Sequence, residues 1–285
     1  MGQTTGISWT DHTFNPHIGC SKVHAGCAHC YAERDFDTRR GVAPWGPHGT
    51  RIVTSEANWK QPSKWNREAE AAGERRRVFC ASLADVFEDW KGPIGGVTRN
   101  WISLDDVRRE LFAVIDSTPF LDWLLLTKRP ENIRRMWSPM LHAEVQPEMH
   151  FRANVWLGTS VSNDETADEQ IPHLMKCRDL SPVLFLSAEP LLGPLDISLW
   201  TPNGSSDPSA FREMMPCVDW VIAGGESGAG FRFVDPDWLR GLRDQCQAGD
   251  VPFFFKQWSG SNPKTLGKIL DGREWCEFPN VSVSV

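Results

Sequence analysis

The stretch DWLLLTKRPENIRRM, residues 122–136, contains the unit from which we predict the fold. It begins with a continuous apolar run, and that run ends in the polar residues Thr127, Lys128 and Arg129. A helical pattern, PENIRRMWSPML, follows at residues 130–141. Strands that are buried on both faces have continuous apolar sequences and occur in parallel sheets. The stretch therefore predicts one strand and one helix of an α/β protein.

The same unit recurs along the chain. Further apolar runs occur at residues 76–82, 154–163, 182–190, 219–228 and 251–258. Helical patterns lie between them at residues 103–118, 163–177 and 235–249. The first of these begins with a Ser N-cap and acidic residues, and the last ends at a Gly that suits a C-terminal cap. Strands that alternate with helices indicate βαβ units, and with a strand near the N-terminus we expect six or seven of them.

Polar residues or glycines stand at the carboxyl end of nearly every expected strand. They are Asp85, Thr127, Lys128, Arg129, Thr159, Ser160, Ser187, Glu189, Gly224, Gly225, Glu226, Lys256 and Gln257. In parallel barrels, functional sites are built at the carboxyl ends of the strands. We therefore predict a full or partial barrel rather than an open sheet, with a site at that end.

Residues 32–77 interrupt the alternation of strands and helices. The segment is rich in Trp, Arg and Pro. We expect a single domain, residues 1–285, in which this segment is an insertion that forms a lid over the barrel mouth. Trp59 and Trp65 stand among lysines and an arginine, a combination that suits stacking on a flipped or single-stranded nucleotide. The alternative is a lid that these Trp side chains anchor.

Composition excludes several classes of protein. The chain is 40% hydrophobic and 24% charged, as expected for a globular protein, and its net charge of −7 gives no global signal for nucleic acid. The sequence has no signal peptide and no apolar stretch long enough to span a membrane. Five of the eight cysteines are scattered, which indicates a reducing compartment, so we expect a cytoplasmic protein with no membrane partner.

The other three cysteines, Cys20, Cys27 and Cys30, are clustered in FNPHIGCSKVHAGCAHCYAE, residues 14–33. Thiolates at such spacing bind zinc or iron–sulfur clusters. Zinc would need a fourth ligand, which a nearby histidine could supply: His12, His17, His24 or His29. An electron-transfer cluster normally uses four cysteines, and no fourth one is close in sequence. A [4Fe–4S] cluster on three cysteines leaves one iron open for a ligand. Three plain structural cysteines are the remaining alternative.

The second half of the cluster, Cys27-Ala28-His29-Cys30, resembles the C-x3-C-x-φ-C motif of radical S-adenosylmethionine enzymes. The first spacing differs, since six residues instead of three separate Cys20 from Cys27. The resemblance implies that the open iron binds the methionine portion of S-adenosylmethionine. An electron from the cluster then cleaves this cofactor to a 5′-deoxyadenosyl radical. It also implies an electron donor such as flavodoxin or ferredoxin.

Eight blocks in order resemble a phage- and bacteria-associated family known mainly as a domain of unknown function. They are ISWTDHTFNPHIGC, SLADVF, LLLTKRPENI, VWLGTSV, FLSAEPLLGPL, WVIAGGESG, VPFFFKQW and LDGREW. Members of that family are described as radical S-adenosylmethionine-like, and some lie beside a gene for a three-Cys-motif partner protein. The resemblance implies a six-stranded partial (β/α) barrel of the radical S-adenosylmethionine type, and such a partner protein.

Cofactor contacts are implied by two further resemblances. Gly224-Gly225-Glu226 resembles the GGE motif that contacts the methionine amino group in many radical enzymes, although here it follows a late strand; a tight turn before a helix is the alternative. Lys128, with Ser160 and Asn163 from the next strand end, resembles the cofactor contacts of spore photoproduct lyase. A solvated Lys128 at a helix start is the alternative. Glu189 ends an apolar strand and suits ribose hydroxyls, substrate or a structural role.

Catalytic and substrate residues are expected from the same strand ends. The segment Ser82 to Asp85 resembles the C-x-x-D of that lyase, in which the cysteine donates a hydrogen atom. Ser82 replaces the cysteine, so Cys80 is the candidate donor, with a role as a small core residue as the alternative. Asp85 is the second catalytic candidate. Substrate contacts are expected from Arg129, Lys256, Gln257, Trp59 and Trp65.

These observations together predict a radical S-adenosylmethionine enzyme that abstracts hydrogen from its substrate, with nucleic acid or a nucleotide as the expected substrate. Two rivals remain open. One is a zinc-stabilised module that binds nucleic acid or protein. The other is a non-catalytic iron–sulfur protein that acts with a partner.

Overall fold

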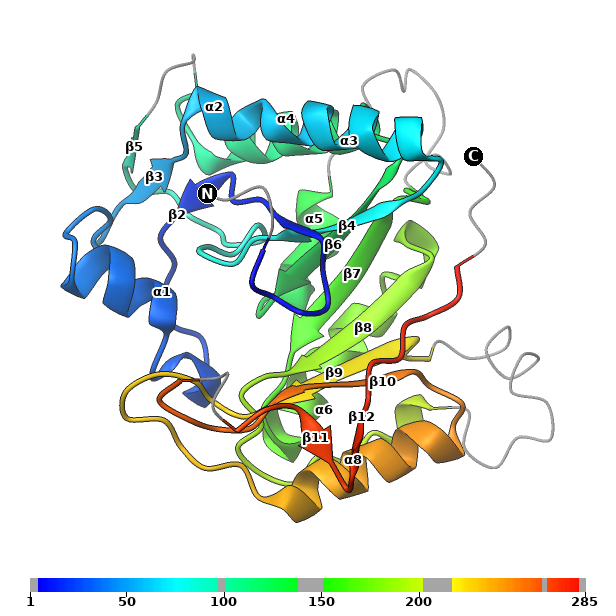
Figure 1. The fold of residues 1–285 in the computed structure, drawn as a ribbon. Helices are drawn as coiled ribbons and strands as arrows, with labels where there is room; N and C mark the ends of the chain where they lie inside the picture. Colours follow the sequence, from blue (N-terminus) through cyan, green and yellow to red (C-terminus); the bar gives the residue numbers. More distant parts are fainter. Residues whose placement is uncertain (1–4, 97–100, 138–150, 202–216, 263–265, 282–285) are drawn as a thin grey trace.

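The computed structural model describes residues 5–96, 101–137, 151–201, 217–262 and 266–281. Its centre is a curled, seven-stranded sheet that forms a parallel half-barrel (Figure 1). In spatial order the strands are β1 (His12–Thr13), β4 (Arg76–Cys80), β6 (Leu121–Thr127), β7 (Val155–Ser160), β8 (Val183–Ala188), β9 (Trp220–Gly224) and β10 (Phe253–Gln257). Every neighbouring pair is parallel. The predicted α/β class is confirmed, and the half-barrel is compatible with the predicted partial barrel, although its sheet has seven strands in place of the six expected.

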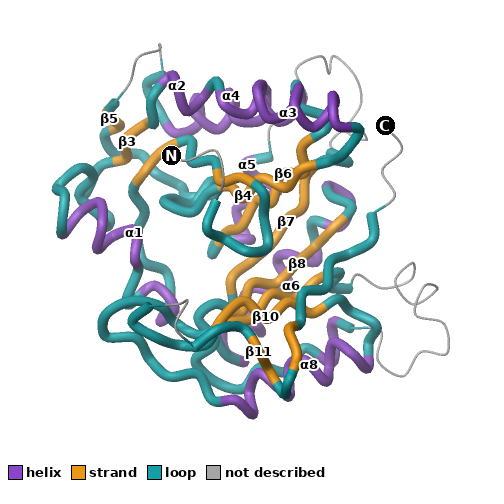
Figure 2. The backbone as a smooth tube through the Cα atoms, viewed as in Figure 1, coloured by secondary structure: helices purple, strands orange, loops and turns teal. Residues whose placement is uncertain are grey.

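In the described part of the chain, four longer helices cover the outside of this sheet, and Figure 2 shows them around the curved layer of strands. They are α3 (Gln61–Ala72), α4 (Leu104–Asp116), α6 (Asp164–Met175) and α8 (Pro236–Ala248). The last three confirm the helices expected from the sequence. Their N-caps follow from local chemistry, because Ser103, Asn163 and Asp235 each accept a hydrogen bond from a backbone N–H of the first turn.

The helix expected at residues 130–141 is shorter than predicted. A 3-10 turn, η3 (Pro130–Asn132), leads into α5 (Ile133–Met136), and Trp137 is already extended. The rest of that pattern, residues 138–141, lies outside the described residues.

Short elements complete the described chain. They are β2 (His17–Ile18), β3 (Arg51–Val53) and β5 (Ile94–Gly95), which form a small mixed sheet; the hairpin β11 (Ile269–Leu270) and β12 (Arg273–Glu274); α1 (Tyr31–Glu33) and α2 (Glu56–Trp59); the π-helical turn η2 (Arg34–Thr38); and the 3-10 turns η1 (Ala25–Cys27), η5 (Arg178–Leu180) and η6 (Ser198–Trp200). The loop between β2 and α1 carries the three clustered cysteines.

The strands bury both faces in two separate cores. On β6, Trp123 and Leu125 pack with the helices in the outer core, whereas Leu124 belongs to the inner core. The inner core fills the curl of the sheet with large side chains: Trp9, Phe79, Leu124, Trp156, Val183, Phe185, Trp220, Ile222 and Phe254. Trp9, from the N-terminal segment, and Phe278, from the C-terminal segment, contact Trp220. Segments from both ends of the chain therefore help close the open side of the half-barrel.

The segment 32–77 is divided between two places. Trp59 and Trp65, on α2 and α3, are buried in the outer core with the helices. Residues 56–72 therefore cover the outer face of the sheet, in the connection between β1 and β4, and are not a lid over the mouth. Trp45, from the same segment, does line the cavity described below.

Among the described residues, no helix has both the length and the apolar character that a membrane crossing requires.

Candidate functional site

A cavity of about 290 Å³ lies at the carboxyl ends of the strands. This volume is close to the lower end of the range for sites that bind small molecules and cofactors. Its lining includes the residues Trp9, Cys20, Ser21, Cys27, His29, Cys30, Tyr31, Trp45, Phe79, Ser82, Asp85, Leu126, Lys128, Ser160, Ser187, Glu189, Gly225, Glu226, Lys256 and Gln257. The inward-facing positions of the strands supply its apolar floor, and the residues just beyond the strand ends supply its polar wall.

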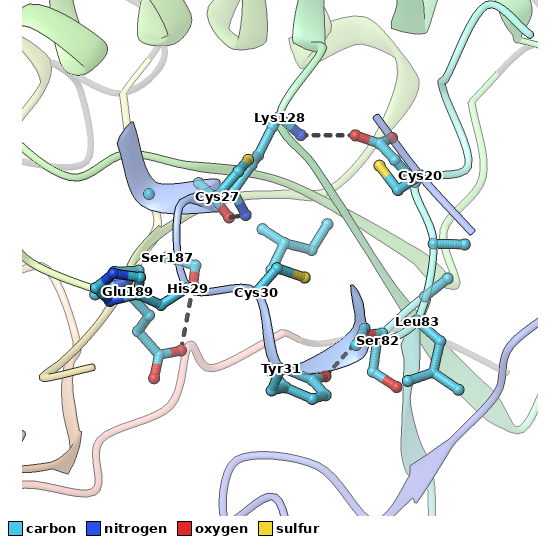
Figure 3. A pocket seen from close by; sticks show the side chains of 18 of the residues that line it. Cys20, Cys27, His29, Cys30, Tyr31, Ser82, Leu83, Lys128, Ser187 and Glu189 are labelled. Atoms are coloured by element: carbon cyan, nitrogen blue, oxygen red, sulfur yellow. Dashed lines mark hydrogen bonds between the residues drawn. The ribbon is translucent and has the colours of Figure 1, made fainter. Parts of the chain in front are cut away.

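All three clustered cysteines line this cavity and are partly buried (Figure 3). Cys20 follows β2, Cys27 ends η1, and Cys30 directly precedes α1. Within the part of the chain that the structure describes, no three His, Cys, Asp or Glu side chains converge on a point where they could hold a single metal ion. The thiols line one cavity without meeting at one centre.

Cys20 lies against a buried cation. Nη1 of Arg129 is 3.5 Å from the Cys20 sulfur, and Nη2 donates to the carbonyl of Ser21 at 2.8 Å. The same guanidinium pairs with Asp85, with 2.9 Å between Nη1 and Oδ2. Burial raises the pKa of the Cys20 thiol to about 12, and the carboxylates of Asp85 and Glu88 add to this, whereas Arg129 acts against it. Cys20 is therefore a protonated thiol at neutral pH unless a metal displaces its proton.

Behind Arg129 lies a second, fully buried ion pair. Arg51 donates from Nε and Nη2 to the two carboxylate oxygens of Glu88, at 2.7 and 2.8 Å. It also donates to the hydroxyl of Ser21 at 2.8 Å, and its guanidinium lies 3.7 Å from the ring centroid of Trp90. The backbone N–H of Ser21 donates to Glu88 as well. This network fixes the residue that follows Cys20.

A different carboxylate anchors the turn that carries Cys27 and Cys30. Glu226 accepts from the Nε and backbone N–H of Arg232 and lies 3.0 Å from Nδ1 of His29. Burial raises the pKa of Glu226, but the hydrogen bonds from Arg232 and His29 outweigh it and lower this pKa to about 2. Glu226 was expected to contact the cofactor. It lines the cavity, and its carboxylate is already engaged by two side chains.

Lys128 reaches into the cavity from the end of β6. Its Nζ donates to the hydroxyl of Ser160 at 3.1 Å, and its backbone N–H donates to Asp85 at 3.0 Å. The three carboxylates of the cavity each pair with another cation: Asp85 with Arg129, Glu189 with Lys256, and Glu226 with Arg232. Among the described residues, the only partner of the Lys128 ammonium is a hydroxyl, so the cavity has an uncompensated positive charge there.

The last two strand ends form the opposite part of the wall. Glu189 pairs with Lys256 at 2.8 Å and accepts from the hydroxyl of Ser187 at 3.2 Å. Gln257 donates to the carbonyl of Gly225. A Cβ on Gly225 would lie 2.2 Å from the backbone nitrogen of Ser259, so this glycine allows two strand ends to approach closely. Gly225 thus has a packing role, while Gly224 lies beside Glu189.

Besides Gly224 and Arg129, four predicted site residues do not line the cavity. Cys80 is fully buried in the outer core, because Phe79 points inward and alternation along β4 turns Cys80 outward; burial raises its pKa. Its expected role as hydrogen donor is therefore wrong. Asn163 caps α6 instead of lining the cavity. Trp59 and Trp65 pack in the outer core, so the expected nucleotide contacts have no support from them.

Two further predicted residues have partners that the sequence did not indicate. Arg129, expected to bind substrate, contacts Cys20 and Asp85. Asp85, expected to be catalytic, accepts from the Thr127 hydroxyl at 2.7 Å and from the backbone of Lys128. Both residues support the cysteine loop and the end of β6.

The candidate zinc-ligand histidines also have other surroundings. His12 stacks on Trp65 at 4.3 Å, and His17 is buried away from the cavity. Burial lowers the pKa of His24 to about 4, and its Nδ1 accepts from the backbone N–H of Gly26. Of these four residues, His29 lines the cavity, and its Nδ1 is held by Glu226.

Sequence reasoning missed several residues of the site. Tyr31, the only tyrosine of the chain, directly follows Cys30 and donates from its hydroxyl to the carbonyl of Ser82 at 2.7 Å. Its position beside the motif was a usable signal. Arg51, Glu88 and Arg232 gave no such signal, because their partners are distant in the sequence.

Comparison with known proteins gives one family and no characterised relative. A family model described as "Protein of unknown function (DUF5131)" matches residues 4–279. No curated protein matches the chain, and no solved structure matches it. Because the family model covers nearly the whole chain, the protein belongs to the DUF5131 family.

Proposed function

We propose that the protein is a radical S-adenosylmethionine enzyme. In this proposal Cys20, Cys27 and Cys30 hold a [4Fe–4S] cluster, and the adjoining cavity binds S-adenosylmethionine. The observation that carries the proposal is that three cysteines line one cavity that also contains the uncompensated ammonium of Lys128. When bound, such a cluster supplies the electron that cleaves S-adenosylmethionine to methionine and a 5′-deoxyadenosyl radical.

The donor set supports a cluster in two ways. Thiolates are the preferred ligands of iron–sulfur clusters. A single zinc ion needs its ligands to converge within about 2.3 Å of one centre, whereas the irons of a cubane are separate corners. Thiols that line a cavity wall without converging on one point are compatible with a cubane cluster. Three protein ligands for four irons would leave one iron without a protein ligand.

The remaining side chains suit an amino-acid-containing cofactor. The Lys128 ammonium is placed to pair with a carboxylate, and Ser160 holds it in position. Glu189 and Ser187 present hydrogen-bonding groups that match ribose hydroxyls. Trp9, Phe79 and Leu126 supply apolar surface that excludes water from a reactive species.

The test begins with anaerobic reconstitution with iron and sulfide. We expect wild-type protein to bind iron and acid-labile sulfide in equal amounts and to form 5′-deoxyadenosine with dithionite and S-adenosylmethionine. Cys27→Ala should lose both. Lys128→Met should keep the cluster and weaken S-adenosylmethionine binding about 10- to 100-fold, because it removes a hydrogen-bonded charge pair of about 1.5–3 kcal/mol.

Lys91→Met is the matched control, since Lys91 is an exposed lysine away from the cavity that pairs with Asp89 and Asp105. Its affinity for S-adenosylmethionine should equal that of wild type. Bound zinc without sulfide would contradict the proposal and favour a zinc-stabilised module. A bound cluster without 5′-deoxyadenosine would instead favour a non-catalytic iron–sulfur protein.

A further inference from the structure

Arg129 distinguishes Cys20 from the other two cysteines. Its guanidinium is the hydrogen-bonding group that reaches the Cys20 sulfur, at 3.5 Å. Cys30 instead has the backbone N–H groups of Ala32 and Glu33 beside it. Among the described residues, neither Cys27 nor Cys30 has a hydrogen bond from a guanidinium. One of the three sulfurs therefore has a guanidinium beside it, and the other two do not.

The position of Arg129 is fixed from several sides. Its side chain is 11% exposed, and it is held by Asp85, by the Ser21 carbonyl and, at 3.4 Å, by Glu88. Asp85 is itself fixed by the hydroxyl of Thr127. A guanidinium held in this way cannot rotate into solvent, so its charge stays beside the sulfur.

We propose that Arg129 is a positioning residue that raises the reduction potential of a cluster bound through Cys20. This inference rests on the proposed function. A reduced cluster has one more negative charge than an oxidised one, so a nearby cation stabilises the reduced form. Hydrogen bonds to cysteine sulfurs and net charge around a cluster set its potential. The step concerned is the transfer of one electron from an external reductant, and no bond in the protein forms or breaks.

The carboxylate of Asp85 opposes Arg129 at the same place. Its Oδ2 lies 2.9 Å from Nη1 of Arg129, the same nitrogen that lies 3.5 Å from the Cys20 sulfur, so the two opposite charges act at one place. Removing the cation and removing the anion should therefore shift the potential in opposite directions. A purely structural loosening of the loop has no reason to depend on the sign of the charge that is removed.

The experiment is a potentiometric titration of reconstituted protein followed by electron paramagnetic resonance, at equal iron and sulfide content per chain. Arg129→Met should shift the midpoint to a more negative potential than wild type, and Asp85→Asn should shift it to a less negative one. Arg129→Lys keeps the charge but loses the planar fork, so its shift should be smaller than that of Arg129→Met.

Unchanged midpoints, or shifts of the same sign in Arg129→Met and Asp85→Asn, would overturn the inference. If Arg129→Met does not retain the cluster, the midpoint potentials of Arg129→Lys and Asp85→Asn are compared with each other instead. Equal midpoint potentials in these two variants would overturn the inference. Failure of the proposed function gives a different result, because wild-type protein then contains no iron and sulfide to titrate.

Discussion

The two parts of the cysteine loop are anchored in different ways. We call residues 19–22 the Cys20 limb and residues 24–30 the Cys27–Cys30 turn. The limb is attached to a buried network in which the Arg51 side chain is 0% exposed. The turn is attached at the rim, where the His29 side chain is 41% exposed and Arg232 donates to the carbonyl of Ala25. The position of Cys20 is thus fixed by a buried network, whereas Cys27 and Cys30 are held by contacts that are more exposed to solvent.

This difference explains the unusual first spacing. The six residues between Cys20 and Cys27 span from the buried network to the outer wall of the cavity. Gly19, at the start of the limb, has φ of 112°, and a Cβ there would lie 2.7 Å from the carbonyl oxygen of Thr50. The limb is therefore tightly packed on its inner side. The packing at Gly19 therefore restricts where the Cys20 limb can lie.

Removal of Arg51, the buried cation to which the Cys20 limb is attached, should lower stability the most. Arg51→Met leaves the carboxylate of Glu88 with fewer partners inside the protein. Breaking one side of a buried ion pair typically costs about 3–5 kcal/mol. We expect a loss of that size in the free energy of unfolding, measured by urea denaturation, together with reduced iron binding on reconstitution.

Arg109→Met is the control for this variant. Arg109 pairs with Asp106 on the surface of α4, and its side chain is 67% exposed. Exposed pairs contribute about 0–1 kcal/mol, so this variant should unfold near the wild-type midpoint. The double variant Arg51→Met/Glu88→Met should recover part of the loss. Equal losses in the Arg51 and Arg109 variants would mean that the limb is not fixed by its network.

A loss of stability smaller than that of Arg51→Met is expected when a side chain is added at Gly26 in the turn. A Cβ on Gly26 would lie 2.7 Å from the hydroxyl oxygen of Ser162 and 2.8 Å from Cε1 of His24. Because Ser162 is buried, Gly26→Ala should displace the turn and cost about 1–3 kcal/mol, as overpacking does. Thermal unfolding measures this loss. Gly6→Ala, where nothing lies within 4 Å of the added Cβ, is the matched control and should leave the midpoint in place.

Local patterns were sufficient to predict most of the fold. Continuous apolar runs identified the strands, and the N-caps Ser103 and Asn163 identified helices, because these signals depend on neighbours in sequence. Lys128 and Ser160 were placed at the strand ends for the same reason, and both line the cavity. The position of each strand end in a parallel sheet follows from the order of the units.

What could not be predicted depends on partners that are far apart in sequence. The pair of Arg51 and Glu88 joins β3 to the loop that follows β4, and neither residue has a local pattern that indicates burial. Cys80 was expected at the site, but residues 78–81 are apolar at every position, so their pattern does not indicate which side chains face inward. Trp65 was assigned to a lid, since an aromatic residue among cations resembles a binding surface until its helix is seen packed on the sheet.

The smallest change in stability is expected when the charge of Glu226, which anchors the Cys27–Cys30 turn, is removed, and this change depends on pH. The pKa of Glu226 falls from 4.5 in the unfolded chain to about 2 in the folded protein. A lowered pKa contributes stability that is present above pH 4.5 and is lost as the pH falls toward 2. Glu226→Gln removes this charge. At pH 6 the variant should be less stable than wild type by about 1 kcal/mol, because its partners are partly exposed.

At pH 3 the two proteins should be closer in stability, since wild type has then lost part of the contribution of Glu226. Urea denaturation at both pH values measures the difference. Glu70→Gln, an exposed position on α3, is the control, and its difference from wild type should be near zero at both pH values. A constant difference between wild type and Glu226→Gln would mean that His29 and Arg232 do not hold the turn through this charge. The turn would then be held by packing and not by the charge of Glu226. The limb and the turn would differ only in how deeply their contacts are buried.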